Sequence, residues 1–172
     1  MKNKKLIYTL AMIFMLLDQT IKLLVTKNMY LSEEIVLIPN FFSLFYLKNT
    51  GAAFSIFGNK TLLLIIISLL CLIILKKYIK SLINVTTLTI ISLGILVGGI
   101  LGNLFDRILY RSVIDYLSFT FFNYNFPVFN LADIGITVGA ILLIISLILE
   151  EKKEKIISKS NWRKELKCQV NM

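Results

Sequence analysis

Four long apolar segments constrain the fold of this chain more than any other feature. They lie at approximately residues 6–25, 58–76, 84–104 and 132–149. A helix needs about 20 apolar residues to cross the hydrocarbon core of a bilayer. The chain is also 57% hydrophobic and 17% charged, whereas soluble domains carry about half apolar and about a quarter charged residues. The sequence therefore predicts an all-α polytopic membrane protein with four transmembrane helices in a single membrane domain, residues 1–172.

The basic residues predict the orientation of these helices. Of the 19 Lys and Arg, 13 precede the first span, separate the second from the third, or follow the fourth. Because Lys and Arg accumulate on the cytoplasmic side, we expect both termini, including a basic tail at 150–172, to be cytoplasmic. Topology thus accounts for the net charge of +9 without a nucleic-acid partner. The N-terminus also has the basic start of a signal peptide, but Asp18 and Lys22 interrupt its apolar run, which favours a retained span.

The two extracytoplasmic loops, expected at 26–57 and 105–131, hold 16 of the 20 aromatic residues. Aromatic side chains concentrate at the headgroup layer of a membrane. In the first loop, an aromatic run, the turn sequence Asn49-Thr50-Gly51 and a short apolar run predict a β-hairpin, and hence a small β-platform on the outer membrane surface. In the second loop, Pro127 and its neighbouring Asn residues predict an ordered turn rather than a helix.

The absence of histidine narrows the possible chemistry. Without it, Ser-His-Asp and Cys-His catalysis are excluded and a catalytic zinc site is disfavoured. The two cysteines, Cys71 in an apolar run and Cys168 in the charged tail, do not form a disulfide framework. We therefore expect neither a metal site nor a cofactor.

All four aspartates fall at or near the outer face, and ionisable groups at membrane depth suggest function. Asp18 and Lys22 are four residues apart on one helix, so an ion pair is the favoured interpretation. A structural role is also favoured for Asp106 and Arg107, with lipid headgroup anchoring by Arg107 as the alternative.

The other two aspartates are the candidates for catalysis. Asp133 begins the fourth span, where a carboxylate is an ordinary helix cap, whereas Asp115 lies among apolar neighbours and is harder to explain structurally. If the two converge, they can share a proton, one activating a water while the other polarises a carbonyl. The spacing alone does not distinguish this catalytic pair from the alternative, in which both carboxylates have structural roles.

Competing functions have weaker support. A Ser-Lys dyad of Ser55 with Lys48 or Lys60 would need a desolvated lysine, but both lysines border exposed loops. The glycines near the end of the third span lack a phosphate-loop motif and favour close helix packing. A non-enzymatic transporter or scaffold would need ionisable groups in the inner halves of the spans, which are nearly bare of them.

Five segments, read together, resemble a known family. They are Asp18-Gln-Thr-Ile-Lys22, Asn49-Thr-Gly-Ala-Ala-Phe-Ser55, Gly98-Gly-Ile-Leu-Gly-Asn-Leu-Phe-Asp-Arg107, Val113-Ile-Asp-Tyr116 and Phe126-Pro-Val-Phe-Asn-Leu-Ala-Asp133. Their order and spacing, from about residue 18 to 149, strongly resemble lipoprotein signal peptidase (signal peptidase II), the bacterial membrane aspartic endopeptidase.

The resemblance implies a substrate, a site and a location. The substrates would be diacylglyceryl-modified prolipoproteins, cut just before the lipidated cysteine by a monomeric enzyme among the lipids of the bacterial cytoplasmic membrane, at its extracytoplasmic face. Asp115 and Asp133 would be the catalytic pair, with no cofactor. The supporting and substrate-binding residues would be Asp18, Lys22, Asn49, Gly51, Gly99, Asn103, Arg107 and Asn130.

Two features depart from the family. Tyr116 stands where the family usually has Phe, and the resemblance implies that its added hydroxyl is harmless. The tail at 150–172 lies outside the match, and we expect a solvated cytoplasmic extension that touches anionic lipid.

Overall fold

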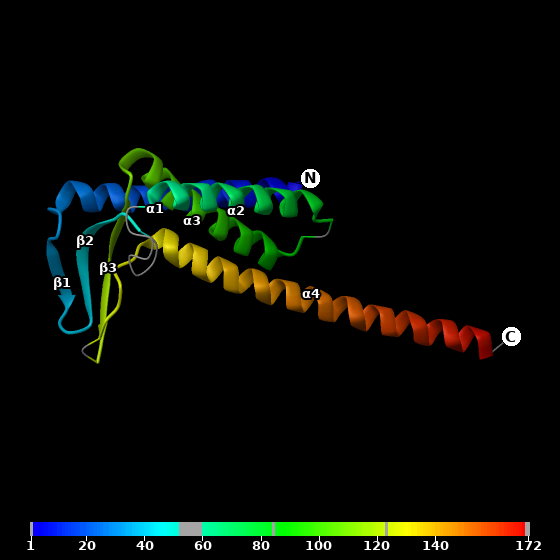
Figure 1. Ribbon diagram of the computed structural model, residues 1–172. Coiled ribbons are helices and arrows are strands. Elements are labelled where there is room, and N and C mark those ends of the chain that lie inside the picture. Colours follow the sequence, from blue (N-terminus) through cyan, green and yellow to red (C-terminus); the bar gives the residue numbers. More distant parts are fainter. Residues whose placement is uncertain (1, 52–59, 84, 123, 171–172) are drawn as a thin grey trace.

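The computed structural model describes residues 2–51, 60–83, 85–122 and 124–170. Their four helices are α1 (Lys2–Asn28), α2 (Thr61–Ser81), α3 (Thr87–Tyr110) and α4 (Leu131–Val170). Each is long and apolar enough to cross a membrane. In Figure 1, α1, α2 and α3 run together, and α4 begins beside α3 and then extends well beyond the other helices.

The helices continue past most edges of the expected apolar spans. Hydropathy locates the hydrocarbon-crossing part, but a helix satisfies its own backbone hydrogen bonds and can continue into charged flanking sequence. Residues 105–110, expected in the second outer loop, therefore belong to α3. Likewise, α4 runs without interruption from the membrane span through the expected tail to Val170.

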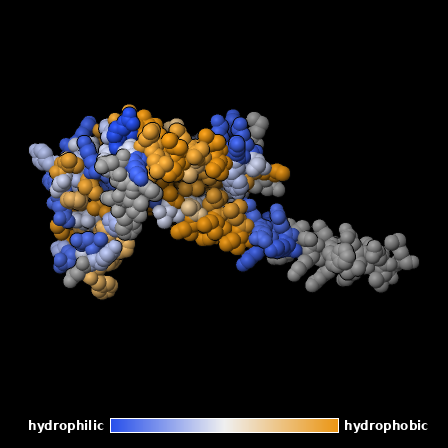
Figure 2. Space-filling view, viewed as in Figure 1, coloured by the Kyte–Doolittle hydropathy of each residue, from blue (hydrophilic) through white to orange (hydrophobic). Residues whose placement is uncertain are grey.

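The third helix is the centre of the bundle. In its most apolar window 67% of residues are buried, against 11% for α2 and 22% each for α1 and α4. Its buried face packs into a cluster with α1 and α2, formed by Ile7, Ala11, Ile79, Ile90, Leu93 and Val97. The outward sides of the other helices leave a broad apolar surface over the bundle, which Figure 2 shows as an orange band.

The loops contribute a small sheet at one end of the helices. Its strands are β1 (Glu34–Ile38), β2 (Phe42–Asn49), β3 (Val113–Phe121) and β4 (Tyr124–Asn125), paired antiparallel in that order. Figure 1 shows the sheet lying across the bundle end. The cluster of Val25, Met29, Tyr46, Ile114 and Tyr116 packs the sheet against α1.

The first loop forms a hairpin, but its turn is not the predicted one. The chain reverses between β1 and β2 at residues 39–41, where Asn40 adopts a left-handed conformation with φ of 57°. Asn49 instead ends β2, and residues 52–59 of the expected second arm lie outside the described residues. The second partner of β2 is β3 from the other loop, a strand that the sequence did not predict. The described residues around Pro127 are not helical, in agreement with the prediction of a turn there.

Candidate active site

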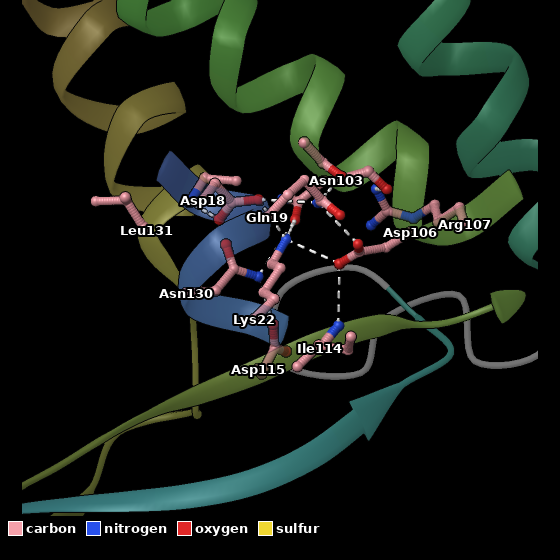
Figure 3. Close-up of polar contacts among 12 residues, drawn as sticks. Asp18, Gln19, Lys22, Asn103, Asp106, Arg107, Ile114, Asp115, Asn130 and Leu131 are labelled. Carbon is pink, nitrogen blue, oxygen red and sulfur yellow. Dashed lines mark hydrogen bonds and ion pairs between the residues drawn. The ribbon is translucent and has the colours of Figure 1, made fainter. Parts of the chain in front are cut away.

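The predicted site residues converge where the C-terminal ends of α1 and α3 and the N-terminal end of α4 meet β3. A cavity of about 750 Å³ opens at this junction. Asn49, Arg107, Asp115 and Asp133 line it together with Thr137 and mainly apolar side chains from residues 126–138. Figure 3 shows the polar side chains of α1 and α3 pointing toward one another just above the strand that carries Asp115.

A buried ion cluster anchors the site on α1. The Lys22 ammonium lies 2.8 Å from Asp18 Oδ2 and 2.8 Å from Asp106 Oδ2. The three side chains are at most 1% exposed. The predicted Asp18–Lys22 pair is therefore confirmed, and Asp106 joins it from α3.

Backbone donors add a hydrogen bond to each carboxylate of this cluster. Asp18 Oδ1 accepts a hydrogen bond from the Ala132 backbone N (2.9 Å), and Asp106 Oδ2 accepts one from Ile114 N (3.3 Å). Buried ion pairs are tolerated when such additional bonds satisfy them. The cluster consequently joins α1 and α3 to the first turn of α4 and to β3.

Gln19, for which the sequence indicated no role, belongs to the same cluster. Its Nε2 donates to Asp106 Oδ1 (2.9 Å) and to the Gly102 carbonyl (3.1 Å), and lies 3.3 Å from Asp18 Oδ2. The only sequence signal was its place beside Asp18, because its other two partners, Gly102 and Asp106, are more than 80 residues away along the chain.

Two asparagines connect the ion cluster to the carboxylate pair. Asn103 Oδ1 accepts from Lys22 Nζ (3.0 Å), and its Nδ2 donates to Asp133 Oδ1 (2.7 Å). Asn130 Nδ2 donates to Asp115 Oδ1 (2.6 Å) and to Asn103 Oδ1 (3.2 Å). The side-chain amide nitrogen of Asn130 therefore joins Asp115 to Asn103, and Asn103 in turn contacts Asp133.

Asp133 is both a helix cap and a cavity residue. Asn130 Oδ1 accepts from Asp133 N (3.0 Å), and Asp133 Oδ2 accepts from Asn130 N (3.2 Å). This reciprocal pair is the capping-box arrangement, which satisfies free N–H groups at the start of a helix. The capping interpretation from the sequence is correct, and Asp133 also lines the cavity.

Asp115 is held in a largely dehydrated position on β3. Its side chain is 2% exposed, and its two oxygens accept from Asn130 and from Asn49 Nδ2 (2.9 Å). Burial, followed by the nearby charge of Asp133, raises the pKa of Asp115 to about 7, against the opposing effect of the two asparagine donors. Asp115 can therefore keep a proton near neutral pH.

Of the remaining predicted residues, Arg107 lines the cavity, and Gly51 and Gly99 lie against residues that line it. The Arg107 guanidinium makes two long contacts, from Nη2 to the Gly51 carbonyl (3.4 Å) and from Nη1 to the Asn103 carbonyl (3.5 Å). Gly51 N donates to Asn49 Oδ1 (2.9 Å), which orients the Asn49 amide toward Asp115. A methyl group on Gly99 would lie 2.5 Å from the Ala132 carbonyl oxygen, so glycine permits the close approach of α3 and α4.

The alternative Ser-Lys dyad has weaker support. Lys48 and Lys60 are exposed, which removes the desolvation that an activated lysine requires. Ser55 lies outside the described residues.

Comparison with known proteins identifies the family. The chain matches the family model described as signal peptidase (SPase) II over residues 10–149. The chain belongs to the signal peptidase II family. A lipoprotein signal peptidase of Clostridium tetani (strain Massachusetts / E88) is 44% identical over 142 residues, which are 81% of this chain and 90% of that protein. Membership makes this chain a peptidase and decides against the transporter and scaffold alternatives.

Solved structures of similar fold support the assignment. Two structures, each described as a bacterial membrane enzyme, match this signal peptidase II with TM-scores of 0.77 and 0.72. Their sequences are 30% and 32% identical to it. The matches cover 84% and 81% of this chain and 88% and 90% of the solved chains.

Proposed function

We propose that this signal peptidase II is an aspartic endopeptidase that removes the signal peptide from diacylglyceryl-modified prolipoproteins. The observation that carries the proposal is the placement of Asp115 and Asp133 on one cavity, joined through Asn130. Cleavage would occur just before the lipidated cysteine. The substrate class is supported by family membership and by the name of the Clostridium tetani relative.

The two carboxylates differ in the groups that surround them, and we base the assignment of their protonation states on this difference. Asp133 lies in the first turn of α4, where the helix dipole and two N–H donors stabilise a negative charge. Asp115 lies on a strand, with burial favouring its protonated form. In our proposal Asp133 is the ionised base, and Asp115 holds the proton.

The reaction then needs only water and this pair. Asp133 takes a proton from water as the oxygen attacks the scissile carbonyl, and Asp115 donates a hydrogen bond to the developing oxyanion. Collapse of the tetrahedral intermediate breaks the C–N bond, and the departing amine takes up the proton held by Asp133. Both carboxyl groups return to their starting states.

The walls of the cavity fit a substrate that lies in a membrane. Phe126, Pro127, Val128, Ile134 and Ile136 make much of its lining apolar. In the proposed orientation both termini are cytoplasmic, and the sheet and cavity lie at the extracytoplasmic membrane surface, where the aromatic residues contact headgroups. One chain supplies every residue of the proposed site, as a monomeric enzyme requires.

The substrate assignment is tested with purified protein in lipid bilayers. The same precursor peptide is offered with and without a diacylglyceryl group on its cysteine, and products are identified by mass spectrometry. We expect one cut, immediately before the cysteine, and only in the lipidated peptide. Equal cleavage of the unmodified peptide, or a cut elsewhere, would reject this substrate assignment.

A further inference from the structure

The hydroxyl of Tyr116, expected to be harmless, makes a specific contact at the site. Tyr116 follows Asp115 on β3 and is 3% exposed. Its phenol oxygen lies 3.2 Å from the backbone N of Leu131 and accepts a hydrogen bond from it. Leu131 is the first residue of α4, the helix that carries Asp133.

Tyr116 holds the chain on both sides of Asn130. Its side chain accepts from Leu131 N, and its backbone N donates to the Phe129 carbonyl (3.1 Å). Asn130, between these two anchor points, donates its side-chain amide to Asp115 and its backbone N–H to Asp133. A shift of this three-residue segment would therefore move the donors of both carboxylates.

The N–H groups of the first turn of α4 show why this hydroxyl is needed. A helix begins with N–H groups that have no partner within the helix. Ala132 N donates to Asp18 Oδ1, Asp133 N to Asn130 Oδ1, and Ile134 N to the Asn130 carbonyl. The Leu131 N–H donates to Tyr116, so removal of the hydroxyl takes away its acceptor.

We propose that Tyr116 is a positioning residue for the peptidase reaction. Its phenol oxygen and backbone N–H fix Asn130, and Asn130 sets the relative placement of Asp115 and Asp133. Burial raises the pKa of the Tyr116 hydroxyl to about 12, so the phenol stays neutral over the working range of a carboxylate pair. The inference rests on the aspartic mechanism proposed above.

The test compares two Tyr→Phe variants of the full chain in lipid. Tyr46 is buried in the same cluster as Tyr116, so Tyr46→Phe is a matched control for loss of a buried hydroxyl. We expect Tyr116→Phe to lower kcat about three- to tenfold, the range for one net hydrogen bond, without changing KM for a lipidated precursor. Tyr46→Phe should leave both parameters unchanged. Equal kcat in the two variants, per folded molecule, would overturn the inference.

A second variant removes the donor instead of the acceptor. Leu131→Pro eliminates the N–H at the first helical position, where proline is well tolerated. In the Leu131→Pro background, adding Tyr116→Phe should cause no further loss of kcat, because the hydrogen bond is already absent. A full additional loss in the double variant would show that the hydroxyl acts through another contact and would overturn the inference.

Asp115→Asn and Asp133→Asn in the same assay separate the two proposals. If both aspartate variants lose activity while Tyr116→Phe and Tyr46→Phe have the same kcat, only the positioning role fails. If both keep wild-type kcat, the aspartic mechanism fails, and the positioning role fails with it.

Discussion

Some residues at this site influence the proposed catalytic carboxylates through a neighbouring side chain and not by direct contact. The Lys22 ammonium can only donate hydrogen bonds, so it requires the oxygen of the Asn103 amide on its side. The nitrogen of the same amide consequently faces Asp133. A charge buried on α1 thereby fixes the orientation of a donor to a proposed catalytic carboxylate on α4.

Replacement of Lys22 tests this dependence. Lys22→Met leaves Asp18 and Asp106 buried without their cation, and breaking a buried pair in this way costs about 3–5 kcal/mol. We expect a matching fall in the free energy of unfolding, measured by denaturant titration in detergent micelles. Lys48→Met, on an exposed site of β2, is the control and should change stability by less than about 0.5 kcal/mol. Equal stability of both variants would show that the cluster does not stabilise the fold.

The pKa of Asp115 predicts a pH dependence. Because the proposed mechanism needs a protonated Asp115, and its pKa is raised to about 7, activity should decline as the pH rises through about 7. The pH profile of kcat/KM on a lipidated precursor measures this alkaline limb. A constant kcat/KM from pH 6 to pH 9 would be incompatible with the proton on Asp115.

Some residue roles could be predicted from the sequence, and others could not. The Asp18–Lys22 pair follows from helical spacing, and the singular position of Asp115 among apolar neighbours marked it as a candidate. The contacts of Gln19 with Gly102 and of Tyr116 with Leu131 join distant parts of the chain. Such pairs become visible only when the helices and strands are assembled.

At the scale of elements, the helices were more predictable than the strands. A membrane-spanning helix is encoded locally by a long apolar run. The sheet instead pairs β2 with β3, from the loop after the third span, and this non-local pairing leaves no local signal in either strand. The sequence Asn49–Gly51 is typical of a hairpin turn. In the structure Asn49 ends β2 and donates a hydrogen bond to Asp115.

The contact between α3 and α4 gives a test at this scale. Gly99→Ala places a methyl group against the Ala132 carbonyl and Ile136, so the first turn of α4 must move away from α3. We expect lower kcat and a lower melting temperature, with Gly99→Ser worse than Gly99→Ala because its side chain is larger. Activity and melting temperature in lipid measure both effects. Wild-type activity in both variants would contradict the requirement for close approach.

At the scale of the whole molecule, we propose that both termini are cytoplasmic and that the sheet lies outside. After replacement of Cys71 and Cys168 by serine, single cysteines at Tyr124 and Lys77 place probes on the sheet and near the opposite end of α2. A membrane-impermeant maleimide added to intact cells should label the Tyr124→Cys variant and leave Lys77→Cys unlabelled until the cells are opened. Labelling of Lys77→Cys in intact cells, with Tyr124→Cys unlabelled until the cells are opened, would show the opposite orientation and contradict this proposal.

The most direct measurement of the central claim is cleavage of a diacylglyceryl-modified prolipoprotein by three purified proteins in lipid: wild type, Asp115→Asn and Asp133→Asn. Each substitution preserves side-chain shape but removes the acid–base chemistry of the pair. With folding verified for all three, we predict that wild type releases the signal peptide and that both variants are slower by about 100-fold or more. Cleavage at the wild-type rate by both folded variants would contradict the aspartic mechanism.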